Sequence, residues 1–169
     1  MTFSVDKISA EAYVYEMIFT LSNRMQCVGD RRDDAVTTIQ GFLVANLTLF
    51  EDYQLNLGEM AQMLGTSRQN VKKTSDLLVK KGYVDLKKDS EDGRNIRIAL
   101  TDKGREYYQI REAQEAAYLE KLFEGLDEDQ VIQMKNGFKV LLENIGSIER
   151  QQTETDSKNS CLTVRKQED

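Results

Sequence analysis

The spacing of apolar residues limits the fold of this chain more than any other feature. Through most of the 169 residues the apolar side chains recur at intervals of three and four, which is typical of helices, and no proline interrupts them. The period changes to two only in Tyr83–Leu86 and Ile96–Leu100, which flank the polar run KKDSEDGRN. We therefore expect a mainly α (α+β) protein with one β-hairpin.

The sequence predicts six helices, each with a start signal. Their expected ranges are about Ser9–Val28, Asp33–Glu51, Leu57–Leu64, Arg68–Lys81, Thr101–Phe123 and Asp127–Ile148. Capping boxes are expected for Asn56 with Glu59, Thr66 with Gln69, and Asp127 with Gln130. From residue 150 to 169 the chain is polar and aperiodic, so we expect a disordered tail after a single domain at 1–149.

The first and last helices carry more apolar surface than one small domain needs. The first helix has two apolar stripes, which make an unusually wide apolar face. In the last helix the apolar residues step by three and four, the period of a coiled-coil seam; they are Val131, Met134, Phe138, Leu141, Ile145 and Ile148. Both patterns predict a partner helix and hence a homodimer.

Charge is distributed unevenly along the chain. The net charge is −6, but residues 66–105 carry eleven Lys and Arg against six Asp and Glu, a balance of 11 − 6 = +5 that leaves −11 for the rest. Local charge decides whether a surface attracts phosphate, so this basic middle segment favours a nucleic-acid partner in spite of the acidic total.

Several functional classes are excluded by composition. The chain has no histidine, and its two cysteines, Cys27 and Cys161, form no CxxC pair. It contains no GxxxxGK[ST], GxGxxG, GxSxG or HExxH motif, so we expect no enzyme, metal or cofactor. The apolar stretch Phe42–Phe50 is too short to cross a membrane and the N-terminus lacks a signal-like core, which predicts a cytoplasmic protein.

The two short middle helices have the outline of a helix-turn-helix, and the hairpin follows them directly. The second of these helices would enter the major groove through its first turns. Polar and cationic residues occupy these turns: Thr66, Ser67, Arg68, Gln69, Asn70, Lys72 and Lys73. Gln and Asn suit adenine edges, Arg suits guanine, and the others suit phosphates. The alternative is a solvated polar helix face.

The hairpin tip carries a second set of candidate contacts. Lys87, Lys88 and Arg94 are cationic, and a narrow minor groove attracts an inserted arginine. Asp92 would be repelled by phosphate, so we expect it to hold the Arg94 guanidinium. An ordinary polar turn is the alternative here.

The segment DGRNIRIALTDKG resembles the wing signature of MarR-type regulators, with Asp92, Arg94, Ile98, Leu100, Thr101 and Gly104 at the expected places. The upstream run LGEMAQMLGTSRQNVKKTSDLLVKKGYV is similar to the paired helices of that family. The resemblance covers about Ser9 to Ile148, and the chain departs from the family pattern at Thr66, Thr74 and Ser75.

This resemblance implies a homodimer on a pseudo-palindromic site in duplex DNA. Residues 52–104 would form the winged helix-turn-helix lobe, and residues 9–28 and 102–148 would form the dimerisation helices. The expected function is a sequence-specific transcriptional regulator, a repressor that a small molecule can release. A winged-helix adaptor that binds proteins without sequence-specific DNA binding is the alternative.

The resemblance also implies a pocket for a small aromatic effector. Tyr15, Phe19, Met25 and Phe50 are the candidates for its lining, although aromatic and Met residues at helical spacing are more often core. Some relatives sense oxidants through a cysteine in the first helix, which makes Cys27 a candidate; a lone cysteine is more often a small buried apolar residue.

Overall fold

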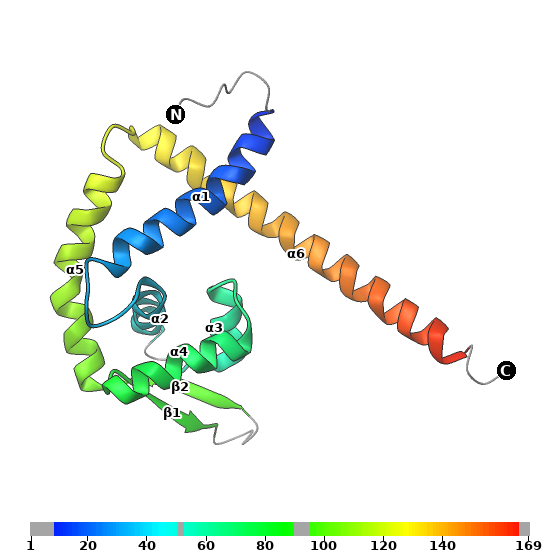
Figure 1. Ribbon diagram of the computed structural model, residues 1–169, viewed down its shortest axis with the longest axis horizontal. Coiled ribbons are helices and arrows are strands. Elements are labelled where there is room, and N and C mark those ends of the chain that lie inside the picture. The colour runs from blue at the N-terminus through cyan, green and yellow to red at the C-terminus, as the bar shows by residue number, and fades with distance from the viewer. Residues whose placement is uncertain (1–8, 51–52, 90–94, 166–169) are drawn as a thin grey trace. The chain divides into compact units, whose positions relative to one another are not determined.

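The computed structural model describes residues 9–50, 53–89 and 95–165. Over these residues the chain forms helices and one two-stranded antiparallel sheet, as the spacing of apolar residues predicted (Figure 1). The elements are α1 (Ala10–Asp30), α2 (Thr38–Leu49), α3 (Leu57–Met63), α4 (Arg68–Lys81), β1 (Val84–Lys88), β2 (Ile96–Leu100), α5 (Asp102–Leu122) and α6 (Glu128–Arg165).

The chain divides into two compact units. The first unit spans Met1–Ala116 and contains α1 to β2 with most of α5, whereas the second spans Ala117–Asp169 and contains the end of α5 and α6. None of the helices that the structure describes has an apolar stretch long enough to cross a membrane.

The core of the first unit lies between α2, α3, α4 and the hairpin. Leu43, Met60, Leu78 and Ile98 are the largest fully buried side chains, and each comes from a different one of these elements. In contrast, α1 contributes no buried residue and α5 contributes only Gly104. The lobe formed by residues 53–100 with α2 thus has its own core, which α1 and α5 flank.

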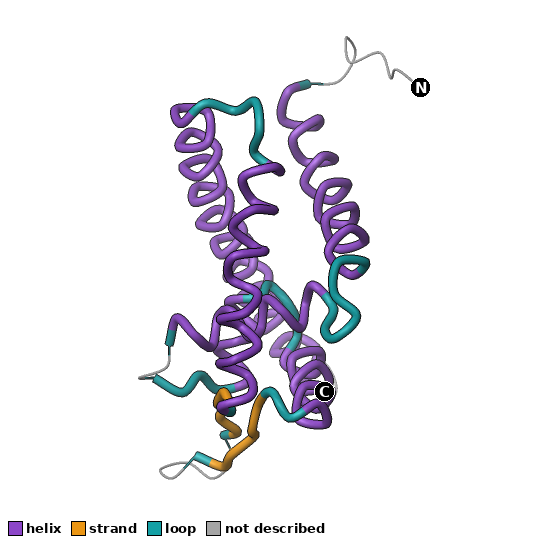
Figure 2. Tube along the Cα trace, turned by 90° about the vertical axis from the view of Figure 1, so that its left-hand side faces the viewer, coloured by secondary structure: helices purple, strands orange, loops and turns teal. Residues whose placement is uncertain are grey.

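The hairpin is in regular register and its stem joins the lobe. Five residue pairs run from Val84↔Leu100 to Lys88↔Ile96. The segment before α3 pairs with β2, because Ile98 N donates to Leu55 O at 2.9 Å and Asn56 forms a bridge with Arg97. Figure 2 shows the two strands side by side.

Two of the three predicted capping boxes are confirmed. The Asn56 side chain accepts from Glu59 N at 3.0 Å while the Glu59 carboxylate accepts from Asn56 N at 2.7 Å. Asp127 and Gln130 exchange the same pair of bonds, at 2.8 and 2.9 Å. Both boxes need only residues three apart, so the local sequence was sufficient to predict them.

One predicted helix cap and one predicted helix start were wrong. The prediction placed a Thr66–Gln69 capping box before α4, but the N-cap is Ser67, whose hydroxyl accepts from Asn70 N at 3.2 Å. The second helix begins at Thr38 and not at Asp33, because Thr37 and Gln40 form an unpredicted capping box. Asp33 instead lies in the preceding loop, where its carboxylate accepts from Ala35 N at 2.7 Å.

The last helix continues beyond its predicted end. The apolar seam stops at Ile148, yet α6 runs on to Arg165, through most of the segment expected to be a disordered tail. Composition explains the difference, because no proline or glycine follows Gly146 to end the helix. The hydroxyls of Thr153 and Thr155 also donate to carbonyls one turn earlier, both at 2.9 Å.

Candidate nucleic-acid interface

The start of α4 exposes a helix N-terminus flanked by polar side chains. Ser67 caps the helix, and Arg68 and Gln69 follow it on the first turn; all three are exposed. The unpaired N–H groups and the helix dipole at such an end favour a phosphate oxygen. Arg68 and Gln69 place a bidentate guanidinium and an amide beside it, two groups that read base edges.

Burial orients α4 so that one side faces solvent along its length. Val71, Ser75 and Leu78 are buried against the lobe at spacings of four and three. The exposed residues therefore include Arg68, Gln69 and Lys73 at the start of the helix. A single stripe of buried residues fixes the helix rotation, so these three side chains project away from the core.

Two predicted contact residues of α4 form hydrogen bonds with nearby side chains of the protein. Lys72 Nζ is 2.5 and 2.6 Å from the two carboxylate oxygens of Asp76, one turn later. Asn70 donates from its amide nitrogen to Thr66 Oγ1 at 3.1 Å. Both residues stay on the interface side, but part of their hydrogen-bonding capacity is used within the protein. The groups best placed to read bases are thus Arg68 and Gln69, with Lys73 beside them.

A shallow hollow runs along this face of the lobe. Its lining residues come from α3, α4 and β2: Leu57, Arg68, Gln69, Lys72, Lys73, Asp76, Leu77, Lys80 and Ile96. Four cations and one carboxylate border it, so its charge suits a polyanion. The sequence analysis did not include Lys80, although it follows Lys73 and Asp76 at the helical spacings that bring side chains onto one face.

The far end of α4 is anchored to α2. Gly82 ends the helix in the left-handed conformation, with φ of 76°. Lys81 reaches across to the start of the second helix, where Nζ donates to Ala35 O at 2.6 Å and to Gln40 Oε1 at 2.9 Å. Lys81 is therefore a structural cation, and it fixes the end of α4 that is opposite the proposed DNA contact.

The hairpin adds cations to the interface. Lys87 and Lys88 are both exposed on β1, as contacts to a phosphate backbone require. Asp92 and Arg94, the predicted tip residues, lie outside the described residues. Arg97, which the sequence analysis did not single out, is bonded to Asp89, with Nε 2.5 Å from Oδ2. No motif in the sequence indicated this pair, whose members are eight positions apart.

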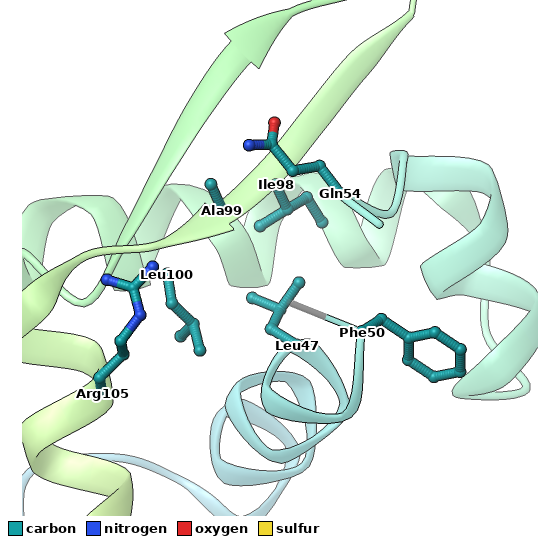
Figure 3. Close-up of a pocket in the computed structure, with 7 residues that line it drawn as sticks. All are labelled: Leu47, Phe50, Gln54, Ile98, Ala99, Leu100 and Arg105. Atoms are coloured by element: carbon teal, nitrogen blue, oxygen red, sulfur yellow. The ribbon is translucent and has the colours of Figure 1, made fainter. Parts of the chain in front are cut away.

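Three of the four predicted effector residues, Tyr15, Phe19 and Met25, lie on α1, and the fourth, Phe50, follows α2 as its C-cap. Tyr15 and Phe19 pack edge to face on α1 with ring centroids 5.1 Å apart, and Met25 is exposed two turns later. Phe50 instead borders a cavity of about 40 Å³, shown in Figure 3, together with Leu47, Gln54, Ile98, Ala99, Leu100 and Arg105. A cavity for one benzene ring is about 150 Å³, so this space does not admit an aromatic effector.

Cys27 is exposed and not buried.

Comparison with known proteins identifies related sequences. Residues 36–95 match the profile of the MarR family. The chain is 29% identical over 106 residues to the HTH-type transcriptional regulator PapX of Escherichia coli, which covers 63% of this chain and 65% of that protein. The chain thus spans slightly less than two thirds of the length of this relative. PapX is a transcriptional regulator by name.

Solved structures have the same fold. A MarR protein from Peptoclostridium difficile superposes with a TM-score of 0.73 at 21% identity, over 86% of this chain and 94% of that one. The MepR–DNA complex of S. aureus superposes with a TM-score of 0.70 at 21% identity, over 82% of this chain and 99% of that one. The match confirms the winged-helix fold, in which a pair of helices is followed by a two-stranded hairpin.

Proposed function

We propose that this chain, whose residues 36–95 match the MarR family profile, is a transcriptional regulator that binds specific sequences in duplex DNA. The start of α4 would enter the major groove, where Arg68 and Gln69 contact base edges. Lys73, Lys80 and the hairpin residues Lys87 and Lys88 would contact the phosphate backbone. Asp92 and Arg94 keep their predicted function at the wing tip.

The single observation that carries this proposal is the exposed first turn of α4. Ser67, Arg68 and Gln69 are exposed there. The opposite side of the helix packs against the core, and Lys81 fixes its C-terminal end. Major-groove recognition requires a rigid helix with hydrogen-bonding side chains at its N-terminus. The guanidinium of Arg68 and the amide of Gln69 meet this requirement. A protein-binding adaptor has no comparable need for base-reading side chains at this position.

We propose that the protein acts as a homodimer. Apolar side chains on α1 and α6 support this, among them Tyr15 at 65% exposure and Leu142 at 69%. Exposed apolar residues in this number are uncommon on a monomer and mark a protein interface. Two copies would present two α4 helices to two half-sites, so the DNA site should be an inverted repeat.

We further propose that binding represses transcription, because a dimer that occupies both half-sites excludes other proteins from the same DNA. The small aromatic effector stays a prediction; of its predicted lining residues, Phe50 borders a cavity of about 40 Å³.

Binding to duplex DNA as a function of salt tests the proposal. Released counterions make the logarithm of affinity fall linearly with the logarithm of salt concentration, with a slope near −0.9 for each phosphate contact. Lys73→Ala should make this slope shallower by about 1. Arg24→Ala, which removes an exposed cation of α1, is the matched control and should leave the slope unchanged. Weak binding with no salt dependence would favour the adaptor.

A further inference from the structure

Arg97 joins the hairpin stem to the segment that precedes α3. Its Nε is 2.5 Å from Asp89 Oδ2 within the hairpin, and its NH1 donates to Gln54 O at 2.5 Å. The guanidinium carbon also lies 5.4 Å from the ring centroid of Tyr53. The Arg97 and Asp89 side chains are only 28% and 5% exposed, so this bond is shielded from water. One side chain thus holds both strands against the lobe.

The partners of Arg97 are held in turn by α3. Tyr53 OH donates to Glu59 Oε1 at 2.6 Å, and the other Glu59 oxygen accepts from Asn56 N at 2.7 Å. These bonds to Asn56 N and Tyr53 lower the pKa of Glu59, so the carboxylate stays charged. We call Tyr53, Gln54, Glu59, Asp89 and Arg97 the wing clamp. It links the hairpin to the first helix of the helix-turn-helix.

The position of the wing clamp along the hairpin gives it a specific mechanical effect. Val84, Ile98 and Leu100 anchor the lower half of the hairpin in the core. The upper half, Lys87–Asp89 with Asn95–Arg97, contributes only partly buried Ile96 to that packing. A two-stranded ribbon on its own is marginally stable in water and twists easily. The tilt of the upper half therefore depends on bonds such as those of Arg97.

We propose that Arg97 is a positioning residue for DNA binding, which sets the orientation of the wing relative to α4 and does not contact DNA itself. This inference rests on the proposed function. Three groups of the protein engage the guanidinium of Arg97, namely the Asp89 carboxylate, the Gln54 carbonyl and the Tyr53 ring. Lys87 and Lys88 then contact phosphate only when the wing clamp holds the upper half in place.

Neutralising Asp89 shows whether Arg97 positions the wing or contacts DNA directly, because the two cases predict opposite changes in DNA affinity. Removing a carboxylate from a DNA-binding surface ordinarily strengthens binding, because it removes repulsion by phosphate. Asp89→Asn should instead weaken binding, since the amide cannot hold Arg97 as the carboxylate does. Asp85→Asn is the matched control: it removes the same charge from an exposed position on β1, the strand that precedes Asp89, and affinity should stay equal or rise.

A second pair of variants tests Arg97 itself. Arg97→Lys keeps the positive charge but loses the planar guanidinium that donates to both Asp89 and Gln54. A direct phosphate contact would tolerate lysine, whereas a positioning residue would not. Arg97→Lys and Arg97→Gln should therefore weaken binding to a similar extent.

The experiment measures affinity and hydroxyl-radical footprints of the full-length variants on a duplex recovered by selection from a random pool. Thermal melts confirm that each variant is folded at the assay temperature. We expect Asp89→Asn and Arg97→Lys to weaken binding about tenfold, the cost of losing one or two contacts of ordinary size. Their footprints should lose the flanking protection from the wing and keep the central protection from α4.

Wild-type affinity for Arg97→Lys, or equal or tighter binding by Asp89→Asn with a complete footprint, would overturn the positioning function of Arg97 alone. Failure of the wild-type protein to select any sequence would overturn the proposed function instead. If Asp89→Asn does not fold, Arg97→Lys decides the question, because lysine is the milder change.

Discussion

Arg111 of α5 and Asp33 of the loop before α2 form an ion pair across 78 residues of sequence, with Arg111 NH1 2.5 Å from Asp33 Oδ2. Tyr107 OH donates to the same carboxylate oxygen, and Ala35 N donates to the other at 2.7 Å. The side chains of Asp33 and Arg111 are 10% and 17% exposed. This group of bonds joins α5 to the lobe that carries α4.

The Asp33 carboxylate should make stability depend on pH. Desolvation alone would raise its pKa, but the bonds from Tyr107 and Ala35 and the charge of Arg111 outweigh it, so the pKa is lowered. A lowered pKa contributes stability above the unfolded-state value of about 3.9 that is lost as pH falls through the folded value. Asp33→Asn should therefore reduce the free energy of unfolding at pH 7 by about 1–3 kcal/mol and flatten its acid dependence. Urea titrations from pH 7 to 3 measure both effects; a variant with the acid dependence of wild type would contradict this assignment.

Replacing serine by alanine should have opposite effects on stability at Ser67, the N-cap of α4, and at Ser75 within the helix. Ser75 is fully buried, and its Oγ has no hydrogen-bond partner among the described residues. Ser75→Ala should raise the free energy of unfolding by about 1 kcal/mol, because it removes an unsatisfied polar group. Ser67→Ala should lower it by about 1 kcal/mol, because it removes the N-cap. Equal signs in thermal melts of the two variants would refute this account of α4.

Gly104 lies where the first turn of α5 touches the hairpin stem. A Cβ at this position would be 2.1 Å from Tyr83 O and 3.1 Å from Leu100 Cδ2. Gly104→Ala should lower the free energy of unfolding by about 2 kcal/mol or more through overpacking. Gly137→Ala in α6 is the control, since no atom lies within 4 Å of its added Cβ. The control should be neutral or stabilising by up to about 1 kcal/mol through helix propensity. Denaturant unfolding measures the stability of both variants. A Gly104→Ala variant as stable as wild type would show that the hairpin stem shifts to accept the added Cβ.

The seam of α6 should hold the dimer. Leu141 lies in the middle of the apolar series from Val131 to Ile148 and is 39% exposed. Leu141→Glu should yield monomers, because a dimer would bury an unpaired charge at this position. Lys139→Glu adds an acid at an exposed neighbouring position outside the seam and should remain dimeric. Light scattering gives the molecular mass of each. A wild-type monomer, or a dimeric Leu141→Glu, would exclude this interface.

The sequence predicted the parts of the fold that depend on neighbouring residues. The Asn56–Glu59 capping box and the Gly82 helix end both follow from residues a few positions apart. The shift of the α4 cap from Thr66 to Ser67 shows the limit of this signal, because two adjacent hydroxyls suit the same function equally well.

Contacts between distant segments were not predictable in the same way. No pattern in the sequence indicates that Arg97 bonds Gln54 O or that Lys81 reaches Ala35 O, because each cation equally suits a solvated surface. Within the candidate site, Arg68 and Gln69 are exposed as the sequence predicted, whereas the bond between Lys72 and Asp76 became visible only in the structure.

Selection from a random pool of duplex DNA, with the purified protein at low and at physiological salt, tests the central claim most directly. The account predicts recovery of an inverted repeat with half-site centres about 10 base pairs apart, or one helical turn. Gln69→Ala should relax the selected sequence at one position in each half-site, by about 1–3 kcal/mol of discrimination. Enrichment of no sequence at either salt concentration would contradict sequence-specific DNA binding by this protein.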